Sequence, residues 1–133
     1  MGIFRKVDTG FWADAYIMSL APDEKLVMVY MLTNTNTTVA GIYAIHKKTI
    51  AAETGIGIRR VNNILRKLEN DGKILSDEST MEVAVLDWCR HNSADSVKMQ
   101  EGIKRAMAEI RSAEIKKAAV KMFGDYEEDE YEV

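Results

Sequence analysis

Residues 47–88 read KKTIAAETGIGIRRVNNILRKLENDGKILSDESTMEVAVLDW and contain four elements in a row. The pattern predicts a helix from His46 to Thr54 that ends at Gly55, and a second helix from Ile58 to Asp71 after a short turn. Two short strands are expected next, at 73–76 and 83–88, joined by a polar turn. This order of elements predicts a winged helix-turn-helix.

Upstream of this stretch, residues 4–20 form an N-terminal arm, with a short helix that is expected to dock Phe11 and Trp12 onto the core. Pro22 is placed to open the first long helix. The run LVMVYML at 26–32 is apolar on every side, so we expect that helix to be covered on more than one side. A short strand is predicted at 41–45.

Downstream, the pattern becomes helical again from Ser93, and its apolar phase shifts near Ser112. We therefore expect two helices, or one kinked helix, ending at Gly124. The last nine residues, DYEEDEYEV, hold six carboxylates and no base, which predicts a disordered acidic tail. The expected fold is mainly α with a small β-wing: a winged domain with its arm at 1–92, a C-terminal helical extension at 93–124 and the tail at 125–133.

Composition limits the class of protein. The chain has 133 residues, of which 47% are hydrophobic, enough for one core. Its single cysteine, Cys89, excludes an intrachain disulfide and fits a reducing cytosol. The N-terminus lacks the apolar region of a secretory signal, and no apolar run is long enough to span a membrane. We therefore expect a protein of the cytoplasm, without a membrane partner.

The net charge of −3 is concentrated in the tail, since residues 1–92 carry 11 basic and 11 acidic side chains. At about 100° per residue, the helix at 58–71 places its apolar side chains on one side. Arg59, Asn63 and Arg66 form the opposite stripe. Arginine can form paired hydrogen bonds with guanine and asparagine with adenine, so this helix is the candidate recognition helix for a major groove.

Further candidate contacts with double-stranded DNA flank this stripe. Residues that open the preceding helix, and a lysine at the base of the wing, are placed to touch the phosphate backbone. The acidic wing tip is expected to close the sheet rather than grip DNA. The full predicted DNA-binding set is Lys47, Lys48, Thr49, Arg59, Arg60, Asn62, Asn63, Arg66, Lys67 and Lys73.

Catalysis has little support in the sequence. His46 and His91 are the only histidines, and Cys89-Arg90-His91 is too sparse for a zinc site. Gly55-Ile56-Gly57 lacks the ending of a phosphate-binding loop. We expect no enzyme activity, no cofactor and no metal.

Most of the chain, from about Phe4 to Phe123, resembles the N-terminal domain of phage replisome-organiser proteins, which are DnaD-like replication initiators of phages and prophages. The similarity is most specific at Phe11-Trp12, Gly41-Ile42-Tyr43, Thr49-Ile50-Ala51, the segment LENDG at 68–72, and Trp88. This resemblance implies a winged helix, DNA binding in replication initiation, self-association and recruitment of helicase-loading machinery. A second, C-terminal domain like that of longer members is expected to be absent, with the acidic tail in its place or with the chain being a short variant or fragment, which puts recruitment of a helicase loader in question.

Two other functions stay open at this stage. One is a protein-interaction or oligomerisation module of a primosome with weak DNA binding, which the balanced charge of residues 1–92 favours. The other is a winged-helix transcription regulator. A homodimer or higher oligomer is expected in any of these, because the apolar helix and the apolar C-terminal stripe exceed what so small a domain needs to bury.

Overall fold

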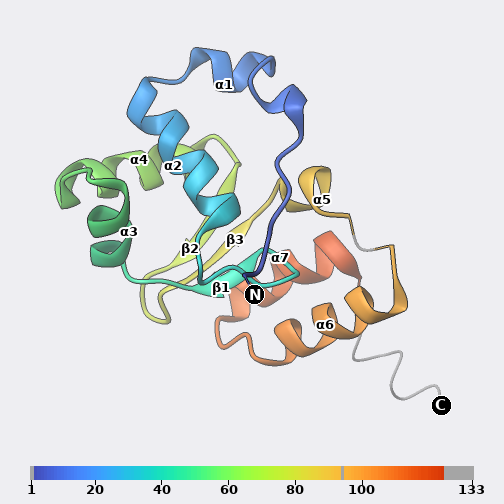
Figure 1. Cartoon of the computed structure of the whole chain (residues 1–133). Helices are drawn as coiled ribbons and strands as arrows, with labels where there is room; N and C mark the ends of the chain where they lie inside the picture. The colour runs from blue at the N-terminus through green and yellow to red at the C-terminus, as the bar shows by residue number, and fades with distance from the viewer. Residues whose placement is uncertain (1, 94, 125–133) are drawn as a thin grey trace.

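The computed structural model describes residues 2–93 and 95–124, so the predicted acidic tail lies outside the described part. The described chain is mainly helical with a small antiparallel sheet, as the sequence predicted (Figure 1). In chain order the elements are a 3-10 turn at Thr9–Phe11, α1 (Ala15–Ser19), α2 (Pro22–Thr33), β1 (Ile42–Ala44), α3 (Lys47–Thr54), α4 (Ile58–Asn70), β2 (Ile74–Asp77), β3 (Glu82–Val85), α5 (Trp88–His91), α6 (Val97–Ala108) and α7 (Ala113–Phe123).

The sheet has the strand order β1-β3-β2, with both neighbours of β3 antiparallel to it. Side chains of successive strand residues point to opposite faces. Tyr43, Val83 and Val85 thus belong to one apolar cluster, which also contains the buried sides of α2, α3 and α4. Ile42 and Ala84 belong to a second cluster on the other face.

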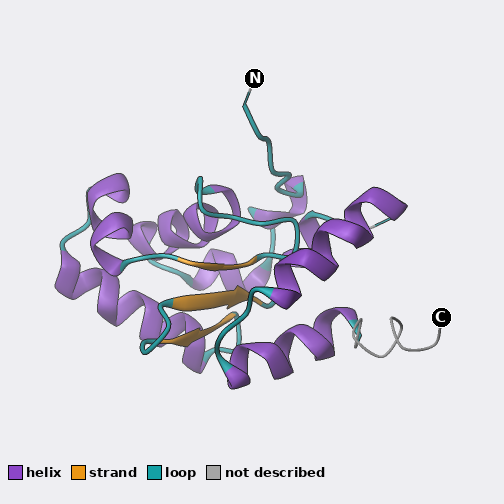
Figure 2. Ribbon diagram, turned by 90° about the horizontal axis from the view of Figure 1, so that it is seen from below, coloured by secondary structure: helices purple, strands orange, loops and turns teal. Residues whose placement is uncertain are grey.

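Helices α6 and α7 cover this second face, so the sheet lies between two groups of helices (Figure 2). The side chains that form the C-terminal apolar stripe, Ile103, Met107, Ile115 and Ala119, are buried there. Our expectation of surplus apolar surface was therefore wrong for this stripe. The buried Glu82 side chain joins β3 to the start of α7, because it accepts hydrogen bonds of 2.8 to 3.2 Å from the backbone N–H groups of Arg111 and Ser112.

The first long helix begins as predicted. Pro22 is its first residue, and the Glu24 carboxylate accepts a hydrogen bond of 2.7 Å from the N–H of Ala21. Within the run at 26–32, Val27, Met28, Met31 and Leu32 are buried, whereas Leu26 is exposed. The run is therefore mostly core.

Two aromatic predictions are wrong. Phe11 is buried, but Trp12 is 61% exposed and only meets the edge of the Phe11 ring, at 5.1 Å between centroids. Trp88 does not end a strand: β3 stops at Val85 and Trp88 opens α5. Its fully buried ring packs against Gly41, whose φ of 69° is open to glycine and strained for other residues.

Among the described residues, no helix combines the length and apolarity that crossing a bilayer requires.

Candidate nucleic-acid interface

Two short helices and a tight turn position the predicted site. The N–H of Gly55 bonds to the carbonyl oxygen of Ala51 at 2.9 Å, and Gly55 adopts the left-handed conformation that ends α3. Gly57, in an extended conformation, then caps α4. The short turn holds the two helices against each other, with Ile50 of α3 and Val61 of α4 in the same apolar cluster.

Helix α4 is strongly two-sided. Val61, Ile64, Leu65 and Leu68 are buried, and these apolar positions fix which side of the helix faces away from the core. Arg59, Asn63 and Arg66 are all exposed on the outward side, as their spacing predicted. Among residues 2–93 and 95–124, no hydrogen bond or ion pair involves the side chains of these three. Together with Lys48, they are the exposed donors of the predicted set that have no hydrogen-bond or ion-pair partner among the described residues.

The other predicted cations of this region, apart from Lys48, are engaged within the chain. Arg60 donates two hydrogen bonds to the Asp23 carboxylate at the start of α2, at 2.6 and 2.9 Å, and lies 3.5 Å from Glu24. This pair clamps α4 to α2. Three lysines also have partners: Lys47 pairs with Glu78 of the wing, Lys67 with Asp71 at 3.2 Å, and Lys73 with Asp87 at 3.8 Å.

Three of these pairs lower the pKa of the acidic partner. The hydrogen bond from Arg60 holds the pKa of the Asp23 carboxyl below its usual value. Lys47 lowers the pKa of Glu78 in the same way. The pKa of Asp71 is lowered by the Tyr16 hydroxyl, which donates a hydrogen bond of 2.7 Å, and then by Lys67. Each shift means that the carboxylate is the stabilised form at neutral pH.

The remaining predicted residues lie around the start of α3 and on the inner flank of α4. Lys48 is exposed, whereas Thr49 and Asn62 are half-buried. The side-chain oxygen of Asn62 is shielded from solvent and has no hydrogen-bond partner within the described residues. Asn62 therefore faces the wing side of α4 and not its outward stripe.

The wing carries structural contacts that the sequence reading missed. Glu82 belongs to the acidic wing, yet its side chain is buried and accepts hydrogen bonds from the N–H groups of Arg111 and Ser112 at the start of α7. Its position after a polar turn gave no signal of this, because the partner amides are about thirty residues away in the chain. Asp77 accepts hydrogen bonds from Ser79 in the turn, at 2.6 and 2.9 Å.

Cys89 and His91, two of the residues considered for catalysis or zinc binding, both lie on α5. The Nδ1 atom of His91 accepts a hydrogen bond of 2.9 Å from the N–H of Asp8, which ties α5 to the N-terminal arm. Cys89 is exposed as a residue, but partial burial of its thiol raises the pKa of that group. Within the described ranges, no three metal-ligating side chains come together.

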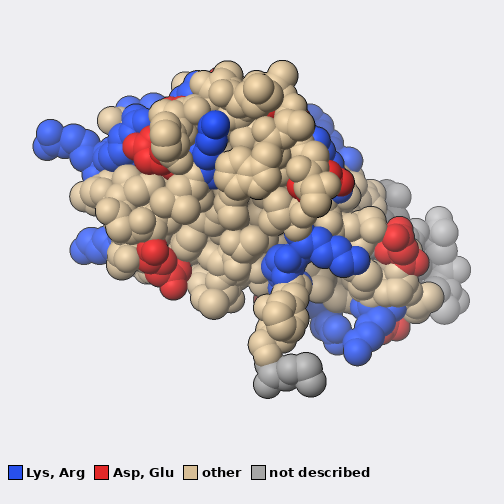
Figure 3. All heavy atoms as spheres, turned by 45° about the horizontal axis from the view of Figure 1, so that its top comes forward, with Lys and Arg blue, Asp and Glu red and all other residues tan. Residues whose placement is uncertain are grey.

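Basic side chains project on the side of the molecule where α3 and α4 lie in Figure 1, with acidic side chains between them (Figure 3). The surface is therefore mixed in charge, and the free arginines stand within it. Comparisons with protein-family models, with curated proteins and with solved structures find no match to this chain.

Proposed function

We propose that the chain is a DNA-binding winged helix in which α4 enters the major groove. The order α2–β1–α3–α4–β2–β3, with β3 between β1 and β2, supports this assignment. In this assignment α3 and α4 form the helix-turn-helix and the β2–β3 hairpin forms the wing.

The observation that carries the proposal is the outward stripe of α4. Arg59, Asn63 and Arg66 are exposed and have no partner among the described residues. Two guanidinium groups and an amide, one helical turn apart on a rigid helix, provide donors for base edges and phosphates. Because α4 is held by its buried face and by the Arg60–Asp23 pair, this stripe is presented without rearrangement of the fold.

The role in phage replication initiation, with self-association and possible contact with a helicase loader, rests on the resemblance of the sequence. For self-association, large apolar side chains remain exposed after α6 and α7 have covered the sheet: Ile3, Phe4, Trp12, Met18, Leu26, Ile58, Met81 and Val97.

A salt titration of duplex binding tests the DNA proposal. With a labelled mixed pool of duplexes, log affinity should fall linearly with log salt, with a slope of about −0.9 for each phosphate contacted. Replacing both Arg59 and Arg66 by alanine should weaken binding by about 1–3 kcal/mol for each residue that contacts a base.

The matched control removes the same charge from the other side of the sheet. Lys98 and Arg105 are exposed on α6, so the Lys98→Ala, Arg105→Ala double variant should lose much less affinity than the α4 double variant. Equal losses would mean that only net charge matters and that α4 is the wrong surface.

The second candidate is an oligomerising interaction module. The pairing of Lys47, Arg60, Lys67 and Lys73 within the chain favours it, because paired cations are less available to phosphates. No duplex binding at low salt in the same titration would support this candidate over the first.

A further inference from the structure

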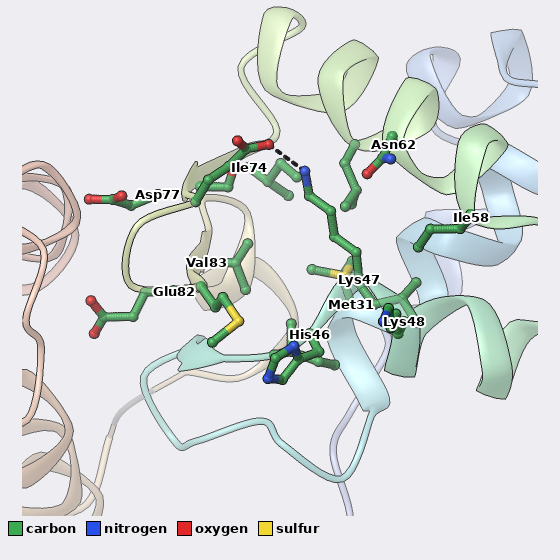
Figure 4. Close-up of a pocket in the computed structure, with 16 residues that line it drawn as sticks. Met31, His46, Lys47, Lys48, Ile58, Asn62, Ile74, Asp77, Glu82 and Val83 are labelled. Carbon is green, nitrogen blue, oxygen red and sulfur yellow. Dashed lines mark hydrogen bonds and ion pairs between the residues drawn. The ribbon is translucent and has the colours of Figure 1, made fainter.

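A pocket of about 470 Å³ lies between the start of α3, the inner flank of α4 and the β2–β3 hairpin (Figure 4). Its volume is in the range of sites that hold small molecules. Much of its wall consists of side chains from the main apolar cluster, among them Ile50, Leu65, Ile74 and Val83. The wall is thus part of the packed core and is already formed.

Most of the charged residues around this pocket are turned away from it or paired, whereas Lys48 is exposed and forms no ion pair among the described residues. The carboxylates of Asp77 and Glu82 point away from its interior (Figure 4), where Ser79 and the start of α7 bind them. Lys47 reaches across the pocket toward the wing and pairs with Glu78. A charged ligand would therefore find only the exposed Lys48 to pair with, and an exposed ion pair contributes little, so a neutral ligand fits the mostly apolar wall better.

Asn62 provides an uncharged polar group on the wall of the pocket. Its side-chain oxygen is shielded from solvent and lacks a hydrogen-bond donor among the described residues, and Asn62 lies on the pocket wall one turn after Ile58. A shielded acceptor without a donor is destabilising, so a ligand N–H or O–H that meets this oxygen when the side chain turns toward the pocket gains a hydrogen bond there. A single water is less suited, because ordered buried waters need two to four polar partners and this wall is mostly apolar.

We propose that this pocket binds a neutral, largely apolar small molecule that donates one hydrogen bond to Asn62 Oδ1. The Lys47–Glu78 ion pair lies over the ligand as a strap between α3 and the wing, and its exposed partners can move to admit the molecule. The proposal is independent of DNA binding, because it uses the inner flank of α4 and not the outward stripe.

Indole and 1-methylindole are suitable probes, because they share a planar apolar body and differ in the N–H donor. Each is titrated into the full ¹⁵N-labelled chain while the backbone amide resonances are followed. Indole should shift the amides of Ile45, Leu65 and Val83 and bind about tenfold more tightly than 1-methylindole, the effect of one hydrogen bond. Asn62→Leu should remove the preference for indole.

Asn63→Leu is the matched control, because Asn63 is one residue along α4 on the exposed side, and it should keep the tenfold preference. Absence of shifts around the pocket at millimolar indole would overturn the proposal. So would equal binding of the two probes to the native chain, a comparison that decides the question even if Asn62→Leu does not fold.

Discussion

The Arg60 guanidinium of α4 and the Asp23 carboxylate of α2 form a pair with two hydrogen bonds, 2.6 and 2.9 Å long. Both side chains lie partly in solvent, with exposed fractions of 43% and 35%. The pair joins the candidate recognition helix to the helix that contributes most to the core. The guanidinium of Arg60 is therefore engaged within the chain, whereas the hydrogen-bond donors of its neighbour Arg59 are available to a ligand.

Replacing Arg60 by alanine should lower the thermal midpoint slightly, because a solvent-exposed ion pair contributes little to stability. Duplex affinity should stay nearly unchanged, since the guanidinium is already occupied. Arg59→Ala should do the reverse, with weaker DNA binding and an unchanged midpoint. Calorimetry and fluorescence anisotropy on both variants measure the contrast. If Arg60→Ala lost as much DNA affinity as Arg59→Ala, Arg60 would also contact the DNA.

Glu78 of the wing holds the ammonium group of Lys47, which the sequence predicted as a phosphate contact. Removing the charge with Glu78→Gln should free Lys47 and raise duplex affinity at low salt by about fivefold, the Coulomb energy of one close pair in water. The salt slope should also steepen by about one unit. The control variant Glu101→Gln removes an equal charge from an exposed position on α6. An equal rise in its duplex affinity would show that Lys47 has no special role.

Gly41 faces the Trp88 ring so closely that an added Cβ would lie 2.3 Å from ring carbons. Gly41→Ala should therefore reduce the free energy of unfolding by about 3–5 kcal/mol, from overpacking and a strained positive φ together. Gly55→Ala is the control for backbone strain alone, since Gly55 has a similar φ of 77° with open space around it, and should cost only about 1 kcal/mol. Urea unfolding compares the two, and similar losses would exclude the clash.

The Gly41–Trp88 contact also shows where prediction from the sequence reaches its limit. The local signals of the chain predicted well: Pro22, Gly55 and Gly72 mark helix ends, and Ser112 separates α6 from α7. Such signals act over a few residues. Trp88 was assigned to a strand together with the apolar run at 83–86, but its place is fixed by packing against a glycine 47 positions earlier.

The same limit holds for the candidate site. Periodicity placed Arg59, Asn63 and Arg66 on the exposed side of α4, because a buried apolar stripe determines the opposite one. It could not reveal that Arg60 has a partner on α2 or that Lys47 has one on the wing, since both partners depend on tertiary contacts. It also placed Asn62 among DNA contacts, whereas its side-chain oxygen is shielded beside the wing pocket.

Glu82 connects β3 to the start of α7 through the backbone N–H groups of Arg111 and Ser112. Glu82→Ala should leave these amides without an acceptor in a buried place and lower the free energy of unfolding by about 1.5–3 kcal/mol, as for hydrogen bonds to a charged group. Glu78→Ala, at the exposed wing tip, should change stability little. Chemical denaturation measures both, and equal small effects would mean that the α6–α7 loop does not depend on Glu82.

His91 should make stability depend on pH. Its ring is buried, and its Nδ1 atom accepts the N–H of Asp8 at 2.9 Å. Burial, and then the nearby charge of Arg90, hold its pKa below the ordinary value of 6.5. Above that pH the imidazole is neutral in both states and has no effect. As the pH falls from about 6.5 toward the lowered pKa, the unfolded chain binds a proton that the folded chain does not, so the free energy of unfolding decreases.

Urea unfolding at several pH values between about 7.5 and 5 measures this dependence, in a range above the ordinary titration of carboxylates. His91→Gln keeps an acceptor for the Asp8 amide and removes the titrating group, so its stability should vary less over the range. His46→Gln, at an exposed position, should keep the native dependence. If His91→Gln retained the full pH dependence, or if the native chain became more stable on acidification, the buried imidazole would not be the group responsible.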